Sequence, residues 1–593
     1  MLKAIADLPF SSVILCDTEY EFGIDADGIP VNGNIPRPVC VCALDLKSGK
    51  RWTEFRGGGS PAAPFPTDAD SLFVAYSAAA EMGTFLELGW DMPRRILDLY
   101  PEFYDLRNGR DGPGGRGLLD ALLHFGLESI GAGHKRNMIT RILAGPPYAA
   151  EERQEISDYC MSDVDALARL LPAMLPNIDW KGALLRGRYG PAVAKIERAG
   201  VPIDVVTNAR MVGLWTPIQG ALISKIDQDY GVYDGTVFKE DKFEALVERL
   251  GLPWLRLPSG KLRKDDDTFR DMARVFPVIS PLRELRHSIG KMRRADLAIG
   301  ADGRARTSLR PFSSKTSRNQ PSSTTNIFGS SVWRRGLIKP APGYALIYCD
   351  YSAEEFAVAA AVSRDVAMMR DYVEGDPYVN FGIAVGMLPP RSTKASAAIT
   401  HPGVRDQLKV ACLAILYGMG PELLGQRMNR SKAVARALIE AHRRRYHAFW
   451  DFAQRTTDHL MRGGSLETAF GWHLHPSRYP NPRSISNFPI QGNAAEILRI
   501  ACMLATEAGI EVCMPVHDAL LVNTPIAALD QTLADVKEKM AQASKAVLGG
   551  FEIRVGVEIF KYPDRYMDEN RGRQMWDTVI GLLDELEATS GGS

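Results

Sequence analysis

The chain has 593 residues, of which 45% are hydrophobic and 24% are charged. This composition is typical of globular proteins and excludes a largely disordered chain. The length exceeds what one hydrophobic core can organise, so we expect about three to five domains. Lys plus Arg and Asp plus Glu both number 71, which gives a net charge of zero. The chain is therefore not basic overall, but an enzyme acting on nucleic acid can still line one cleft with positive charge.

The cysteines and the lengths of the apolar segments indicate the redox compartment of the protein and whether it spans a membrane. The chain has eight cysteines without the paired C-x-x-C spacing of a zinc site. Cys40 and Cys42 lie in an apolar, strand-like run, and we expect them to be core residues. Scattered free thiols are typical of a reducing cytosol. No stretch of about 20 consecutive apolar residues occurs, so the sequence predicts no membrane-spanning segment.

Acidic residues follow the first apolar run of the chain, which ends in Asp17 and Glu19. Side chains at positions i and i+2 of a strand point the same way, so both carboxylates could reach one metal ion. Residues 156–171 show helical periodicity and carry Tyr159 and Asp163, which would share one helix face. The helix would add a phenol able to orient a water molecule and a further carboxylate ligand.

The region from about residue 181 to residue 340 has mainly helical patterns. Residues 189–204 indicate a helix followed by a turn, residues 242–250 are amphipathic, and residues 283–294 indicate a helix rich in Arg, His and Lys. Such basic side chains suit contacts with phosphates, which carry no sequence information. For any single one, a solvated surface charge is the alternative.

Two aspartates stand at the ends of predicted strands. One apolar run ends at Asp350 and precedes an alanine-rich helix; residues 512–522 indicate a hairpin with His517 and Asp518 at its turn. A carboxylate at the end of a buried strand is costly unless it is paired, and a divalent cation is the usual partner. Converging aspartates could hold two metal ions about 4 Å apart, which suits phosphoryl transfer. For one strand-end Asp alone, a cap or turn role is the alternative.

Two cations lie four residues apart on a predicted helix that runs to Gly418. Arg405 and Lys409 therefore share one helix face. Arg binds phosphate with a planar fork and Lys acts as a point charge, so the pair suits a triphosphate.

These motifs occur in the order shown by family A DNA polymerases, the DNA polymerase I family. Motif A of that family resembles Asp350-Tyr351-Ser352-x-x-Glu355, and motif B resembles Arg405-x-x-x-Lys409 with Tyr417-Gly418. Motif C resembles Val516-His517-Asp518. The primer–template segment of the family resembles Arg483-x-x-x-Asn487-x-Pro489-x-Gln491-Gly492. The resemblance covers about residues 10–566. It implies an α/β multidomain protein with a right-hand polymerase of palm, fingers and thumb, which adds dNTPs to a primer on template DNA.

The resemblance also implies roles for the motif residues. Asp350 and Asp518 would bind two Mg²⁺ ions, with Mn²⁺ as a substitute, and Lys409 would assist catalysis. The residues implied to contact the dNTP are Tyr351, Glu355, Arg405, Lys409, Leu413 and Tyr417, and those implied to contact DNA are Arg318, Arg483, Asn487, Gln491 and His517. Glu355 would be the steric gate that excludes ribonucleotides; a first-turn Glu favoured by the helix dipole is the alternative.

Two positions depart from the family pattern. Leu413 stands where the family usually has an aromatic residue, which puts sugar discrimination in doubt, and Ala519 stands where the family commonly has Glu. These departures motivate one alternative, a catalytically inactive nucleic-acid-binding protein. A nuclease whose palm only clamps DNA is another.

The first 180 residues resemble the RNase H-like 3′–5′ exonuclease domain that is joined to family A polymerases. Its first and third motifs match Asp17-x-Glu19 and Tyr159-x-x-x-Asp163. Its middle motif, Asn-x-x-x-Asp, corresponds to Ser77 and Glu81. The resemblance implies metal-dependent proofreading with two Mg²⁺ ions, with the ligands and catalytic groups Asp17, Glu19, Glu81, Tyr159 and Asp163. For Glu81, a solvated charge on a helix face is the alternative.

We therefore expect six segments along the chain: an exonuclease domain (1–180), a connector and thumb (181–340), palm (341–395), fingers (396–480), palm again (481–566) and a C-terminal extension with a peripheral helix and a tail (567–593). The short layout and the Asn319-Gln320-Pro321 variant are most similar to bacteriophage members. This similarity implies a monomeric replicative enzyme in the host-cell cytoplasm, with accessory replication proteins of the phage as further partners.

Overall fold

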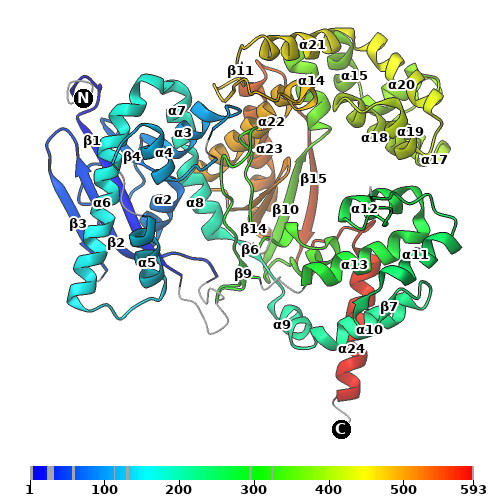
Figure 1. The fold of residues 1–593 in the computed structure, drawn as a ribbon, viewed down its shortest axis with the longest axis horizontal. Helices are drawn as coiled ribbons and strands as arrows, with labels where there is room; N and C mark the ends of the chain where they lie inside the picture. Colours follow the sequence, from blue (N-terminus) through cyan, green and yellow to red (C-terminus); the bar gives the residue numbers. More distant parts are fainter. Residues whose placement is uncertain are drawn as a thin grey trace.

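The computed structural model describes residues 5–22, 33–56, 60–112, 114–128, 132–257, 259–292, 297–322 and 325–590. An N-terminal α/β unit lies beside a second body, whose central sheet carries one helical lobe above it and another below it in Figure 1. Within the described residues, no helix is long and apolar enough to cross a membrane. All eight cysteines are free and buried, as predicted for Cys40 and Cys42.

The N-terminal unit is built on a five-stranded sheet in the order β3-β2-β1-β4-β5. Its strands are β1 (Ser12–Glu21), β2 (Arg37–Asp45), β3 (Arg51–Phe55), β4 (Ser71–Ala75) and β5 (Ile96–Asp98). Val13 and Leu15 face one hydrophobic cluster and Ile14 and Cys16 face another, so helices cover both faces of β1. A strand buried on both faces is apolar along its length, which explains the uninterrupted run before Asp17.

Helices surround this sheet. They are α2 (Ala79–Leu88), α3 (Leu99–Arg107), α4 (Leu118–His124), α5 (Ala132–Leu143), α6 (Ala150–Met174) and α7 (Trp180–Gly187). The predicted helix over 156–171 is confirmed as the central part of α6, which packs across β1 and β2. The long helix α8 (Tyr189–Ala199) then leads from this unit into the second body.

The second body centres on a four-stranded antiparallel sheet in the order β13-β14-β10-β15. Its strands are β10 (Tyr344–Tyr351), β13 (Val512–Val516), β14 (Ala519–Pro525) and β15 (Val555–Lys561). The predicted strand ending near Asp350 and the predicted hairpin turning at His517 and Asp518 are therefore both confirmed. The helices α22 (Pro482–Glu507) and α23 (Leu529–Val547) pack together beside the sheet.

The upper lobe follows β10 along the chain (Figure 1). Its helices are α14 (Glu354–Ser363), α15 (Val366–Val373), α16 (Pro377–Ala384), α17 (Lys394–Thr400), α18 (Val404–Leu416), α19 (Pro421–Met428), α20 (Lys432–Arg445) and α21 (His447–Met461). The short strands β11 (Leu466–Glu467) and β12 (His473–Leu474) pair after α21. The predicted helix bearing Lys409 ends at Leu416, two residues early, because Gly418 adopts a left-handed φ of 69°.

The lower lobe precedes β10. It contains β6 (Val201–Pro202), β9 (Arg304–Ala305), β7 (Tyr233–Asp234), β8 (Val237–Phe238), α9 (Val205–Gly213), α10 (Trp215–Asp227), α11 (Glu240–Arg249), α12 (Asp266–Val275) and α13 (Ser280–Met292). The helix predicted at the start of 189–204 and the helix predicted over 283–294 are confirmed as α8 and α13, and the amphipathic segment 242–250 corresponds to α11, although residues 293–294 lie outside the described part of the chain.

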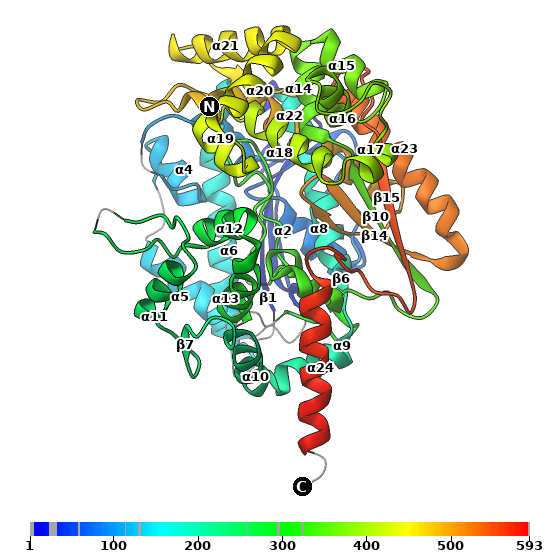
Figure 2. The same ribbon diagram turned by 90° about the vertical axis from the view of Figure 1, so that its right-hand side faces the viewer.

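The C-terminal helix α24 (Arg573–Ser590) extends away from both sheets toward the C-terminus (Figure 2). A helix is confirmed here, and it is packed against the lower lobe: Val579 and Leu583 are fully buried, and α10 is its neighbour. Arg210 donates to Glu587 at 2.6 Å and to Asp584 at 2.7 Å. The predicted tail, residues 591–593, lies outside the described residues.

The N-terminal unit docks onto the second body through α3. The buried pair Glu102–Arg186 has an N–O distance of 2.6 Å, and the Arg186 guanidinium also donates to the carbonyls of Phe470 and Gly471. The Nδ1 atom of His473 lies 2.8 Å from Oδ2 of Asp105. Both contacts join α3 or α7 to the segment around β12, so the placement of the two bodies depends on buried polar contacts.

The His473–Asp105 contact should make this docking depend on pH. The hydrogen bond to Asp105 raises the pKa of His473, although partial burial acts in the opposite direction. Glu467, 3.6 Å from the other ring nitrogen, also raises this pKa. A raised folded pKa adds stability that is complete below about pH 6.5 and is lost as the pH rises through the folded pKa. We expect His473→Gln to lower the free energy of unfolding by about 1 kcal/mol near pH 6 and by clearly less near pH 9.

Thermal unfolding of the full chain at the two pH values measures this difference. His447→Gln, at an exposed position on α21, is the matched control and should show no difference between them. Equal destabilisation by His473→Gln at both values would contradict an ionic contribution.

Candidate active sites

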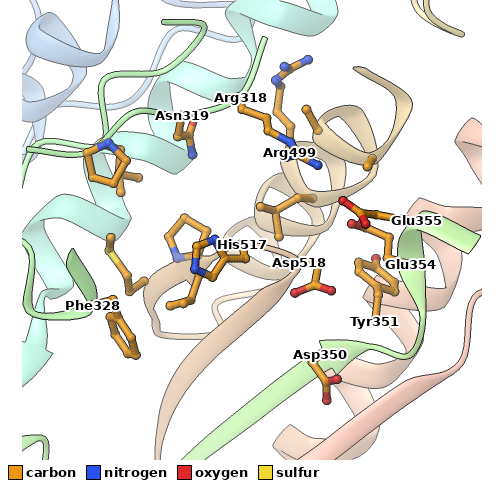
Figure 3. A pocket seen from close by; sticks show the side chains of 18 of the residues that line it. Arg318, Asn319, Phe328, Asp350, Tyr351, Glu354, Glu355, Arg499, His517 and Asp518 are labelled. Carbon is orange, nitrogen blue, oxygen red and sulfur yellow. The ribbon is translucent and has the colours of Figure 1, made fainter. Parts of the chain in front are cut away.

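A cavity of about 630 Å³ opens where the sheet of the second body meets α14, α18 and α22. Figure 3 shows its wall, with Asp518 between Asp350 on one side and Glu354 and Glu355 on the other. The predicted site residues in the wall are Arg318, Asp350, Tyr351, Glu355, Lys409, Leu413, His517 and Asp518. The fold therefore brings together residues that lie up to 200 positions apart in the chain.

Of the two predicted metal-binding aspartates, Asp350 lies on β10 and Asp518 lies in the hairpin turn directly before the neighbouring strand β14. Asp350 pairs with Ala519 across the β10–β14 ladder, and the Tyr351 N–H donates to the Asp518 carbonyl at 3.1 Å. His517, at the turn, takes a left-handed φ of 58°, and this conformation places Asp518 at the start of β14. On the other side of β10, a Cβ at Gly556 would lie 2.4 Å from Oδ1 of Asp350, so only glycine leaves room for that carboxylate.

The electrostatics of this pair suit a hard divalent cation. Burial, together with the carboxylates of Asp350 and Glu355, raises the pKa of Asp518 to about 6, while Lys409 acts in the opposite direction. Like charges held together in a partly buried site are costly until a cation neutralises them. Oxygen ligands on rigid strands are what Mg²⁺ and Mn²⁺ prefer, so the residues present fit the predicted ions.

The predicted steric gate has a partner that the sequence did not specify. Glu355 lies in the first turn of α14, and its Oε1 accepts a hydrogen bond from the Tyr417 hydroxyl, just beyond the end of α18. Gln491 on α22 also hydrogen-bonds Tyr417. Three separate helical segments thus fix one carboxylate at the cavity wall.

Arg405 is placed differently from Lys409. Its guanidinium donates to Asp376 at 2.8 and 3.1 Å and lies over the Tyr378 ring, and it is absent from the described cavity wall. Asp376 in turn caps the start of α16. Of the pair predicted to bind a triphosphate, only Lys409 reaches the cavity in this structure.

The predicted DNA-contacting residues of α22 occupy its first turns. Arg483 is exposed at the N-terminal end, and Asn487 and Gln491 are half-buried further along. Like Arg405 and Tyr417, these three residues are not part of the cavity wall. They share the helix that passes beside the cavity through Ala494, Ala495 and Leu498.

Two charged residues of the cavity, Glu354 and Arg499, were not predicted from the sequence. Glu354 is 4% exposed, and no described group hydrogen-bonds its Oε1; burial and Asp518 raise its pKa well above the ordinary value. Arg499 donates to the carbonyl and hydroxyl oxygens of Ser317 and so holds the segment that bears Arg318. Glu354 could have been predicted because it is a second acidic residue beside Glu355. No feature of the sequence near Arg499 indicated its role.

The second predicted site forms in the N-terminal unit. Carboxylate oxygens of Asp17 and Glu19 on β1 and of Asp163 on α6 all lie within 4.8 Å of one another. Tyr159, one turn before Asp163, hydrogen-bonds it, and burial together with the three carboxylates raises the pKa of the phenol, which therefore stays protonated. A cluster of three carboxylates at such separations is a suitable ligand set for a divalent cation.

Glu81 lies close to this cluster without belonging to it. It is 3% exposed on α2, so the alternative of a solvated helix-face charge is wrong. Burial, Asp98 and Glu19 raise its pKa, and no described group hydrogen-bonds its Oε2. Asp98 accepts from the N–H groups of Ser77, Ala78 and Tyr100, which makes it the cap that shapes the start of α2 and α3.

Comparisons with known proteins agree with this geometry. Residues 301–561 match the family model described as DNA polymerase family A. DNA polymerase I, thermostable, of Thermus caldophilus is 27% identical over 238 residues, which cover 38% of this chain and 28% of the relative. The DNA polymerase of Mycobacterium phage D29 is 22% identical over 68% of this chain and 67% of the relative. DNA polymerase I of Aquifex aeolicus is 22% identical over 82% of this chain and 94% of the relative. The match thus spans well under two thirds of the length of the Thermus caldophilus relative.

A solved structure shares the fold. The POL domain of Pol1 from M. smegmatis, in complex with DNA primer-template and dNTP, superposes with a TM-score of 0.66 at 17% identity and covers 98% of each chain. The predicted polymerase fold is therefore confirmed. The part of the chain that carries both aspartates, residues 301–561, therefore matches DNA polymerase family A.

Proposed function

We propose that this protein is a DNA-dependent DNA polymerase that extends a primer with dNTPs. The observation that carries the proposal is the convergence of Asp350 and Asp518 in one cavity with Lys409 and Glu355. That set supplies cation ligands, a positive charge for phosphate and a carboxylate near the site of the sugar. The relative from phage D29 is a DNA polymerase, and the similar structure of Pol1 was solved with DNA primer-template and dNTP, which supports these partners here. The proposed role is replicative and of the phage type.

In this proposal the chain positions the reactants on rigid elements. Two divalent cations, when bound, would activate the primer 3′ hydroxyl and stabilise the leaving oxygen. Asp350 and Asp518 hold the ligand positions from adjacent strands, and Lys409 offers its ammonium to the triphosphate from α18. Arg405 would join Lys409 after leaving Asp376, through a rotation of α18 that closes the site over a paired nucleotide. Leu413, in the wall beside Lys409, offers an aliphatic surface to the sugar.

The proposal for DNA contacts follows from the elements around the cavity. Arg318, placed by Arg499 through Ser317, and His517 at the hairpin turn would contact the primer end. Arg483, Asn487 and Gln491, on one side of α22, would contact the template and the minor-groove edges, which report the shape of a correct base pair. The basic helix α13 in the lower lobe would grip the duplex through its phosphates.

We further propose that the N-terminal unit is a 3′–5′ proofreading exonuclease. Asp17, Glu19 and Asp163 would hold the cations, and the protonated Tyr159 would orient the attacking water. Glu19 is near enough for its charge to raise the pKa of Glu81. Glu81 would therefore be close enough to supply a further oxygen to a bound cation. The arrangement supports hydrolysis of the terminal nucleotide of a single strand.

Asp518→Asn should abolish extension while it preserves the fold. The amide keeps the shape of the side chain but removes the charge that binds the cation, and we expect the extension rate to fall by about 100-fold or more. Primer extension with Mg²⁺ and dNTPs measures this rate. Glu552→Gln, which changes an exposed carboxylate paired with Lys545, is the control and should extend normally. Normal extension by Asp518→Asn would contradict the polymerase site; absence of extension by the wild type, with DNA binding intact, would favour the inactive binding protein or the clamping nuclease.

The double change Asp17→Ala and Glu19→Ala should separate the two activities. It removes two of the three clustered carboxylates, so degradation of a labelled single strand should fall by about 100-fold or more while primer extension continues. Asp165→Asn changes a nearby exposed carboxylate on α6 that pairs with Arg51, and it should leave degradation unchanged. Undiminished degradation by the purified double variant would show that the nuclease site lies elsewhere.

Glu355→Ala should relax the choice of sugar. Removal of the carboxylate frees the space that a 2′-hydroxyl needs, and we expect the dNTP-to-rNTP ratio of kcat/KM to fall by about 10- to 100-fold. Tyr417→Phe, which deletes only the hydroxyl that holds Glu355, should lower the ratio by less. In the Glu355→Ala background the Tyr417→Phe effect on this ratio should vanish, because the two residues act through one contact. Additive effects would reject a shared steric gate.

A further inference from the structure

Three thiols meet in the N-terminal unit, near the carboxylate cluster. Cys40 and Cys42 stand two residues apart on β2 and so share one face of the sheet, and Cys160 approaches them from α6. All three are at most 1% exposed, and their sulfur atoms lie within 4.8 Å of one another. Among the residues that the structure describes, this is the one group of three or more cysteines so placed.

The separation of the Cys40 and Cys42 sulfurs matches that of two thiolate ligands of one metal ion. The Sγ atoms of Cys40 and Cys42 are 3.8 Å apart. Zn²⁺–thiolate bonds of about 2.3 Å in a tetrahedron give sulfur–sulfur edges of about 3.8 Å. Two hydroxyls flank the sulfurs: Ser157 Oγ lies 3.6 Å from the Cys40 sulfur, and Thr53 Oγ1 lies 3.7 Å from the Cys42 sulfur. The Cys40–Cys42 separation therefore matches one edge of such a tetrahedron, and the Cys160 sulfur lies within 4.8 Å of both, with oxygen groups beside them.

We propose that Cys40, Cys42 and Cys160 form a binding site for one thiophilic divalent cation of the Zn²⁺ and Cd²⁺ class. Thiolates are soft ligands that select such ions over Mg²⁺, which the hard carboxylates of the neighbouring cluster prefer. Binding forms three metal–sulfur bonds and releases the three S–H protons to solvent. A buried thiol by itself packs as a small hydrophobe. The convergence of three thiols from two elements is what distinguishes this group.

The site is connected to the carboxylate cluster by a short path. The Cys160 S–H donates to the backbone carbonyl of Asp17 at 3.3 Å, and Cys160 lies between Tyr159 and Asp163 on α6. Metal binding would remove the proton that makes this contact and fix α6 against β2. A change in single-strand degradation on metal loading would follow, and this consequence alone rests on the proposed exonuclease function.

Cadmium binding tests the site independently of activity. Reduced full-length protein is titrated with Cd²⁺ in excess Mg²⁺, which occupies the carboxylates, and the sulfur-to-cadmium charge-transfer absorbance is followed; cadmium NMR then counts the sulfur ligands. We expect one tightly bound Cd²⁺ per chain with three sulfurs. Cys42→Ser and Cys160→Ala should lose the absorbance or reduce the sulfur count to two. Cys502→Ser, at a buried thiol on α22, should bind like the wild type.

Each outcome decides the proposal. Circular dichroism tests whether each variant is folded. If Cys160→Ala does not fold, Cys42→Ser is used in its place. Absence of sulfur-bound cadmium in the folded wild type would overturn the site, as would unchanged absorbance in Cys42→Ser. Cadmium bound with three sulfurs but with no change in degradation would keep the site and reject only its connection to the carboxylate cluster.

Discussion

The structure depends on the free-energy cost of placing several carboxylates on or next to buried strands. Asp350 ends the central strand of its sheet, with β14 on one side and β15 on the other, so its position is fixed by hydrogen bonds along both edges. Gly556 leaves the space for its carboxylate, and the hairpin turn at His517 brings Asp518 beside it. The carboxylates in such a site repel one another, and a bound cation would remove this repulsion. Without a cation, the rigid sheet holds the carboxylates in place.

The same constraint extends to the assembly of the two bodies. The buried Glu102–Arg186 pair and the contacts of Asp105 join α3 to the segment around β12, far from either carboxylate site. Replacing one member of a buried pair leaves an uncompensated charge, whereas the complete pair contributes geometry more than net stability. If the N-terminal unit is the proofreading nuclease proposed above, it must stand at a fixed place relative to the proposed polymerase site, and directional polar contacts can specify such a placement.

The local part of this architecture could be predicted from the sequence. Apolar runs identified β1, β10 and the hairpin, and helical periodicity identified α6, α11 and α13, because those signals lie within a few residues. The partners supplied by the fold had no local signal. Arg499 holds Ser317 from 182 positions away, Asp376 captures Arg405 from another helix, and Cys160 joins two cysteines more than a hundred residues earlier. Glu81 was expected as a ligand or a solvated charge, and only the packing of α2 revealed its burial.

The two carboxylate sites, though unrelated in sequence, share one physical design. Each combines a strand-borne aspartate with an acid from a distant element: Asp17 with Asp163, and Asp350 with Asp518. Each also keeps a buried glutamate nearby, Glu81 or Glu354, whose pKa is raised by burial and by a cluster carboxylate, and one of whose oxygens lacks a hydrogen-bond partner among the described residues. A neutral carboxyl costs less to bury than a charged one, so these glutamates can stay inside the protein without a cation. Because a cation favours the ionised form, binding of a cation at either proposed site would be linked to proton release.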